Sequence, residues 1–117
     1  MMLSVSEKNF SKTVLESPNP VLVHFWAPWC GLCRLILPTL AKFQSESCLN
    51  LEIVGINADD NFRLANRYRL RNLPTIILFH GGEPIARLED FQSRDDLYRS
   101  LKGVTIPNLV ASNGLTA

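Results

Sequence analysis

The chain has 117 residues, 46% of them hydrophobic, and a formal net charge of +1 at pH 7. This length suffices for one compact domain with a two-layer core but leaves no room for a second domain. The balanced charge offers no broad basic surface for nucleic acid, and the longest apolar run, around residues 76–79, is far too short to cross a bilayer. We therefore expect a protein that binds neither nucleic acid nor membrane.

The first segment predicts a short strand followed by a helix. Ser6 can cap this helix, whose apolar side chains share one face: Phe10, Val14 and Leu15. Pro18 and Pro20 end the helix, because proline lacks the N–H that a helix needs. Residues 21–26 then form an apolar run rich in β-forming residues, which predicts a strand.

A second helix is predicted over residues 30–47. Its apolar side chains recur at helical spacing: Leu35, Ile36, Leu40 and Phe43. Pro38 lies inside this pattern and is expected to kink the helix.

The next two elements predict a crossover between parallel strands. Residues 51–57 alternate weakly and predict a strand, and residues 60–69 predict a helix that turns Phe62 and Ala65 toward the core. Such a connection between parallel strands is right-handed.

A hairpin and a helix complete the domain. Residues 75–79 and 84–88 predict two antiparallel strands joined by a turn at Gly81-Gly82. Ser93 is expected to cap a final helix whose apolar residues are one turn apart: Leu97 and Leu101. The order of elements predicts an α/β fold, a mixed sheet covered by helices on both faces.

The chain is divided by this pattern into one domain and a tail. The domain covers residues 1–102, and residues 103–117 are polar, rich in small residues and without periodicity. We expect this segment to be a loosely held C-terminal tail.

A Cys-x-x-Cys motif, Cys30 to Cys33, lies between the strand at 21–26 and the long helix. A thiol at a helix N-terminus is stabilised as a thiolate by partial positive charge and unpaired N–H groups. Two intervening residues let the second sulfur reach the first, so the pair can alternate between dithiol and disulfide. The motif therefore predicts disulfide exchange, with one attacking and one resolving thiol.

Zinc binding is the alternative interpretation of the cysteine pair. A structural zinc site needs four ligands, and the chain offers only His24, Cys48 and His80 beyond the pair. We therefore expect no metal and no bound cofactor, and interpret Cys48 as a passive thiol near the end of the helix. The first residues contain no basic segment followed by a long apolar one, so we expect a cytoplasmic protein whose thiols serve catalysis.

The sequence Trp29-Cys30-Gly31-Leu32-Cys33, followed by Leu73-Pro74-Thr75 before an apolar strand, resembles the thioredoxin family over residues 3–102. The resemblance implies a thioredoxin-like fold. It also implies that Cys30 attacks the disulfide of a partner protein and that Cys33 resolves the mixed disulfide.

Partner-binding residues follow from the same resemblance. Pro74 resembles the family's cis-proline, which lies beside the cysteines and presents backbone groups to a substrate peptide, whereas an isolated X-Pro bond is usually trans. Trp29 is expected on the partner-facing surface, and Trp26 against the catalytic helix. The expected partner-binding set is Trp29, Gly31, Leu32, Leu73, Pro74 and Asp90.

Three departures from the family's pattern bear on function. Leu32 stands where proline is usual between the cysteines, which bears on how reducing the couple is. His24 stands where the family has a buried aspartate, and Gly55 aligns with a common lysine near it. Asp90 stands where a glycine commonly lines the partner groove, so partner choice is expected to differ.

His24 has two interpretations. Strand alternation puts it on the same face as Leu22, and the resemblance puts it behind the cysteines. It either assists proton transfer during resolution by Cys33 or is a neutral core histidine hydrogen-bonded to backbone. Burial lowers the pKa of histidine and a neighbouring thiolate raises it, so the sequence leaves the direction open, but the ring is expected to take a proton near neutral pH.

The sequence as a whole predicts an atypical thioredoxin, a monomer that reduces disulfides of partner proteins and receives electrons from a separate NADPH- or ferredoxin-dependent reductase. Leu32 suggests one alternative, a weakly reducing or oxidising member that forms or isomerises disulfides. A second alternative is a binding or redox-sensing module with a thioredoxin fold. The intact cysteine pair argues against a pure binding module, which needs no thiols at exchange spacing.

Overall fold

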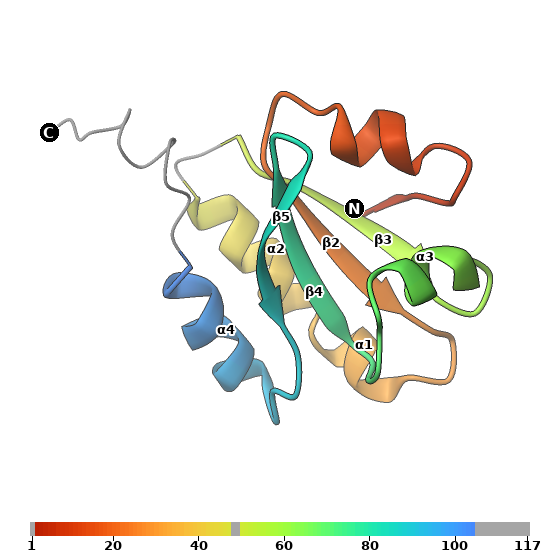
Figure 1. Cartoon of the computed structure of the whole chain (residues 1–117). Helices are drawn as coiled ribbons and strands as arrows, with labels where there is room; N and C mark the ends of the chain where they lie inside the picture. Colours follow the sequence, from red (N-terminus) through yellow and green to blue (C-terminus); the bar gives the residue numbers. More distant parts are fainter. Residues whose placement is uncertain (1, 48–49, 105–117) are drawn as a thin grey trace, which may run out of the picture.

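The computed structural model describes residues 2–47 and 50–104, which form a mixed five-stranded sheet with helices on both faces (Figure 1). The strands are β1 (Leu3–Ser4), β2 (Val21–Trp26), β3 (Glu52–Asn57), β4 (Thr75–His80) and β5 (Glu83–Leu88). Their order is β1-β3-β2-β4-β5, with β1 and β2 parallel to β3, β4 antiparallel to β2, and β5 antiparallel to β4. The predicted α/β fold and mixed sheet are confirmed.

The alternating side chains of β2 separate two cores. Val21, Val23 and Phe25 pack with η1 (Ser11–Leu15) and α3 (Phe62–Arg67) on one face. Leu22 packs with α2 (Leu37–Glu46) and α4 (Arg94–Lys102) on the other. Figure 1 shows α2 and α4 side by side on one side of the sheet, and α3 with the N-terminal helix on the other. His24 shares the Leu22 face, as the alternation predicted.

The N-terminal helix is shorter and starts later than predicted. Ser6 Oγ accepts a hydrogen bond from the Lys8 N–H at 3.2 Å, and the Ser6 N–H donates to Asn9 Oδ1 at 2.8 Å. These local bonds close a turn over residues 7–9, and the helix that follows is the π-helical turn η1. Phe10 and Val14 are buried, so the predicted apolar face is confirmed.

The predicted helix over 30–47 is divided into α1 (Gly31–Leu35) and α2, with Ile36 between them. The expected effect of Pro38 is confirmed, because its ring and missing N–H prevent an uninterrupted helix. Ile36 and Leu40 remain in the core. Leu35, which belongs to the predicted apolar pattern, is 50% exposed, because it lies about 100° around the helix from the neighbouring Ile36, away from the buried face of Cys33, Ile36 and Leu40.

The helix α3 also differs from prediction. It begins at Phe62, and Phe62 is 64% exposed, so its predicted burial is wrong. Asn61, just before the helix, is buried and fixed by two hydrogen bonds: its Oδ1 accepts from the Glu7 N–H, and its Nδ2 donates to the Asn57 carbonyl. This anchoring turns Leu64 into the core in place of Phe62.

The C-terminal elements match the prediction closely. Gly81 and Gly82 have φ values of +63° and +82°, the left-handed pair that a two-residue hairpin turn requires. The Ser93 side chain accepts a hydrogen bond from the Asp96 N–H at 3.1 Å and caps α4. Leu97 and Leu101 are buried against the sheet.

Two predictions fall outside the described residues: the passive thiol Cys48, and positions 105–117 of the predicted tail. Within residues 2–47 and 50–104, no helix combines the length and apolar character needed to span a membrane.

Candidate active site

The two cysteines of the motif form a disulfide just beyond the carboxyl end of β2. Cys30 is the N-cap of α1 and Cys33 lies in its first turn, and their Cα atoms are 5.3 Å apart. A backbone turn leads from the strand to the motif, with the Cys30 N–H donating to the Ala27 carbonyl. Arg34 closes over this turn, since its Nη1 donates to the Pro28 carbonyl at 2.8 Å.

The sulfur of Cys30 lies within the first turn of α1. Cys30 Sγ accepts a hydrogen bond from the Cys33 N–H at 3.1 Å, the arrangement that stabilises negative charge on this sulfur after reduction. Cys30 is less exposed than a solvent-facing thiol, at 5%, and Cys33 is 2% exposed. Cys30 is therefore the more exposed of two largely buried cysteines.

Pro74 follows a cis peptide bond at the start of β4, as the resemblance implied. The residue before it, Leu73, packs against the small cluster of Ala27, Cys30 and Cys33. Thr75 Oγ1 donates to the Asn72 carbonyl at 2.6 Å and closes the loop around Pro74. The fold thus brings the Leu73-Pro74 loop next to the cysteine pair.

Trp29 is 69% exposed and borders a shallow groove. Its Nε1 donates to Asp59 Oδ2 at 3.1 Å, which fixes the indole ring across the end of β3. The opposite wall of the groove comes from the loop before Pro74, including Asn72 and Leu73. Gly31 is exposed, and Leu32 is partly buried against the cysteine cluster and against the α2–α4 core.

Asp90 is exposed and has a φ of +63°, a conformation that glycine adopts freely and that aspartate tolerates better than most residues. Its Oδ1 accepts a hydrogen bond from Asn72 Nδ2 at 2.6 Å. This bond ties the connection between β5 and α4 to the loop that precedes Pro74.

A charged cluster supports the same loop. Glu89 accepts hydrogen bonds from Arg87 at 3.1 Å and from Arg71 at 3.4 Å. These bonds, that from Arg87 above all, lower the pKa of Glu89. Arg87 also donates to the carbonyls of Tyr68 and Arg69. The carboxylate thus remains ionised where it holds the segment before Pro74.

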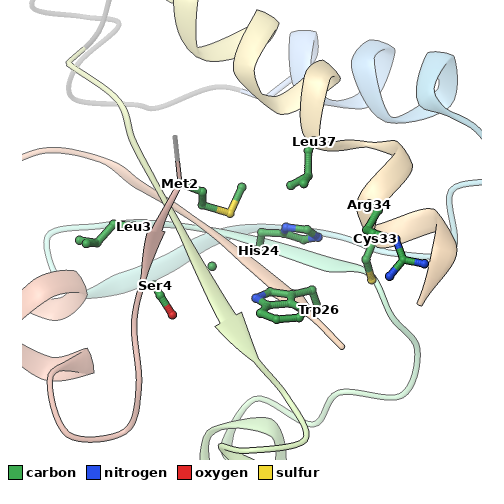
Figure 2. Close-up of a pocket in the computed structure, with 9 residues that line it drawn as sticks. Met2, Leu3, Ser4, His24, Trp26, Cys33, Arg34 and Leu37 are labelled. Atoms are coloured by element: carbon green, nitrogen blue, oxygen red, sulfur yellow. The ribbon is translucent and has the colours of Figure 1, made fainter. Parts of the chain in front are cut away.

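His24 lines a pocket behind Cys33, on the sheet face that carries α2 (Figure 2). It is 1% exposed, and within the described residues neither Nδ1 nor Nε2 has a hydrogen-bond partner. The interpretation of His24 as a backbone-bonded core residue is therefore wrong. Burial lowers the pKa of His24 to about 4, so with Cys30 and Cys33 oxidised the ring is neutral at pH 7 and the expected protonation near neutral pH is also wrong.

Gly55 is the direct partner of His24 in the register of β2 with β3. A Cβ at Gly55 would lie 2.9 Å from Met2 Sδ and 3.2 Å from Trp26 Nε1. Met2 and Trp26 therefore occupy the space that a longer side chain at this position would need. Trp26 also packs against the cysteine cluster, as expected.

Several residues of the site were not found by sequence reasoning: Met2, Arg34, Leu37, Asp59, Asn72 and Arg87. Asp59 follows the carboxyl end of β3, which is parallel to β2, so strand topology alone could have placed it near Trp29. Asn72 and Met2 reach their partners through contacts between distant segments. The sequence carries no local signal for such contacts.

Comparison with known proteins adds independent evidence. Residues 1–103 match the family model for thioredoxin. The chain is 36% identical over 107 residues to a thioredoxin of Mycobacterium tuberculosis, covering 92% of this chain and 91% of that one. It is 37% identical over 107 residues to a bifunctional thioredoxin reductase/thioredoxin of Mycobacterium leprae, covering 92% of this chain but only 23% of that longer protein. An M-type chloroplastic thioredoxin of Chlamydomonas reinhardtii is 44% identical over 80 residues, 68% of this chain and 57% of that protein.

The burial of His24 predicts a specific dependence of stability on pH. Between pH 6.5 and about 4 the unfolded chain binds a proton at His24 that the folded chain excludes, so stability falls as the pH decreases through this window. The loss amounts to roughly 3 kcal/mol. His24→Leu should remove this dependence, and at pH 7 it should raise the free energy of unfolding by about 1 kcal/mol because no ring nitrogen is left unpaired. Urea unfolding of the oxidised protein from pH 7.5 to 4 measures both effects.

The matched control is His80→Gln, which changes the other histidine, at the partly buried end of β4. This variant should keep the pH dependence of the wild type. If His24→Leu kept the same steep slope, another group would be responsible for the acid sensitivity.

Proposed function

The chain belongs to the thioredoxin family and is a thiol-disulfide oxidoreductase, and we propose that it reduces disulfide bonds of partner proteins through Cys30 and Cys33. One observation carries the proposal: the Cys30–Cys33 disulfide lies at the start of α1 with the Leu73–cis-Pro74 segment packed against it. This arrangement combines a redox pair with a backbone edge that an extended peptide can approach.

The proposed reaction transfers two electrons from the dithiol to the partner. The Cys30 thiolate attacks one sulfur of the partner's disulfide, and the departing partner sulfur takes a proton. Cys33 then loses its proton and attacks Cys30 Sγ, which releases the second partner thiol and forms the Cys30–Cys33 disulfide. Two features support this division of roles: Cys30 is the more exposed cysteine, and its sulfur accepts the Cys33 N–H.

Partner binding is proposed for the groove lined by Trp29 and Leu73, next to cis-Pro74. Gly31 and Leu32 lie between the two cysteines and are proposed to contact the same partner, and their exposed and partly exposed positions support this role. Asp90 adds an exposed carboxylate next to Asn72, where the resemblance implies an uncharged glycine. We propose that this carboxylate contributes to the choice of partner.

Electrons are proposed to come from a separate thioredoxin reductase. Thioredoxins act on disulfides and are reduced by such enzymes, and one relative of this chain is a bifunctional thioredoxin reductase/thioredoxin. The proposed donor is an NADPH- or ferredoxin-dependent reductase, which must also recognise the altered groove. A reducing compartment such as the cytoplasm fits a dithiol that must be regenerated. The proposed reaction uses one cysteine pair and needs no second copy of the chain, so a monomer is proposed.

Cys30→Ser is expected to abolish the reduction of insulin disulfides, because no attacking thiolate remains. Cys33→Ser is expected to accumulate long-lived mixed disulfides, because attack succeeds and resolution fails. Non-reducing gels of the variants with a disulfide substrate measure the trapped species. If alkylation of the reduced wild type modified Cys33 faster than Cys30, the two roles would have to be exchanged.

The second candidate function, a weakly reducing or disulfide-forming oxidoreductase, rests on Leu32. Proline at this position would restrict the start of α1, as in the family's usual motif. Leu32→Pro should therefore make the couple more reducing, which equilibration with glutathione buffers measures. An unchanged or more oxidising potential would contradict this account of Leu32.

His24 is proposed to accept the proton of Cys33 during resolution. Both residues line the same pocket, and the ring nitrogens have no competing partner among the described residues. Burial lowers the pKa of His24 to about 4 while Cys30 and Cys33 are joined in the disulfide. In the mixed disulfide the thiolate forming at Cys33 raises the pKa of the ring, and this negative charge allows the neutral imidazole to act as the base.

His24→Ala should slow resolution of the mixed disulfide, most strongly near pH 5.5, where few Cys33 thiolates form without a base. Stopped-flow measurement of resolution between pH 5.5 and 8.5 gives the dependence. Rates equal to those of the wild type over the whole range would leave His24 as a packing residue alone.

A further inference from the structure

The pocket behind Cys33 is a mainly apolar hollow that is open on one side, and among the described residues His24 is its one buried polar side chain. Its volume is about 240 Å³, and its apolar wall includes Met2, Leu3, Trp26 and Leu37. In Figure 2 the His24 ring lies in the middle of these side chains, with Leu37 above it and Trp26 below. Gly55 has no side chain, which lets Met2 and Trp26 approach its backbone and form part of the wall.

His24 supplies unmet hydrogen-bonding capacity to this space. The neutral ring has one N–H donor and one acceptor nitrogen, and within the described residues both are without partners. Buried polar groups almost always have a partner, because an unmade hydrogen bond costs stability. The pocket therefore favours an occupant that can pair with the imidazole.

The size and chemistry of the pocket define that occupant. An apolar cavity of about 150 Å³ is enough to bind benzene, so this pocket has room for a six-membered ring and one substituent. A hydroxyl group can both donate to and accept from a neutral imidazole. Among the described residues of the pocket wall only Arg34 is charged, and its guanidinium is already hydrogen-bonded to the Pro28 carbonyl.

We propose that this pocket is a binding site for small neutral hydroxylated aromatic molecules of the phenol class. The ring packs against Trp26 and Leu37, and the hydroxyl group pairs with His24. Because Cys33 forms part of the wall, the occupant touches the sulfur environment that changes on reduction. Ligand affinity then differs between the disulfide and dithiol forms, and by linkage the ligand shifts the redox equilibrium toward the form that binds it better.

The shift in the redox equilibrium rests on the proposed function of Cys33, whereas ligand binding to the disulfide form does not. The test therefore uses the full chain with its disulfide intact at pH 7, titrated with phenol and with toluene while amide NMR spectra are recorded. Phenol should bind saturably and shift the amide signals of Gly55 and Cys33. Toluene, which has the same shape without the hydroxyl group, should bind roughly five-fold more weakly.

Leu37→Trp and Leu35→Trp form a matched pair of variants. Both leucines are largely exposed, at 41% and 50%, but Leu37 lines the pocket and Leu35 does not. Leu37→Trp should fill the pocket mouth and weaken phenol binding at least ten-fold, while Leu35→Trp should bind as the wild type does. His24→Leu should keep a pocket but bind toluene at least as tightly as phenol.

Three results would overturn the proposal: no saturable phenol binding, equal binding of phenol and toluene to the wild type, or unchanged phenol binding in Leu37→Trp. An insulin-reduction assay on the same samples separates this proposal from the proposed function. Loss of reductase activity with intact phenol binding overturns only the function, and active protein without phenol binding overturns only the pocket ligand.

Discussion

The pairing of β2 along both of its edges is the constraint on which the site depends. β2 bonds to β3 on one side and β4 on the other, and its first five residues are fully buried. A strand held in this way cannot shift by one residue without moving its whole apolar set to the wrong face. Its carboxyl end therefore delivers the cysteine pair to a fixed place, and its pairing with Thr75 brings the Pro74 loop alongside.

The same strand places an ionisable ring where a hydrophobic side chain would be more stable. His24 gains no hydrogen bond among the described residues, and its burial makes the fold sensitive to acid. A core residue that lowers stability is explained when it has a role in the reaction, and the proposed proton transfer to His24 is such a role. Replacement of His24 by an apolar residue is then expected to raise the free energy of unfolding and to lower the rate of mixed-disulfide resolution.

Local patterns were enough to predict the elements that hold the site. The alternation over 21–26, the Gly81-Gly82 turn and the Ser93 cap each depend on a few neighbouring residues, and all three are confirmed. The outward positions of Leu35 and Phe62 were missed. Leu35 lies beside the buried face that contains Ile36 and Leu40, and the anchoring of Asn61 turns Leu64 inward in place of Phe62. Apolar spacing alone does not tell which of two neighbouring apolar residues faces the core.

The contacts that shape the groove and the pocket behind Cys33 depend on tertiary structure. Asn72 and Asp90 are separated by 18 positions, and Met2 fills the space at Gly55 on another strand. The family resemblance identified Gly55, Pro74 and Asp90 as positions of interest. It did not identify the neighbours that surround them, since those contacts come from segments distant in the sequence.

The left-handed backbone at Asp90 limits how this groove can evolve. Glycine, asparagine and aspartate are the residues that tolerate such a φ at low cost, and only the last two can hydrogen-bond to Asn72. Few single substitutions at this position would keep both the backbone and the tie to the proline loop. New partner preferences are therefore more accessible through changes at Trp29, Arg71 or Asp59, whose side chains line the groove without demanding an unusual backbone.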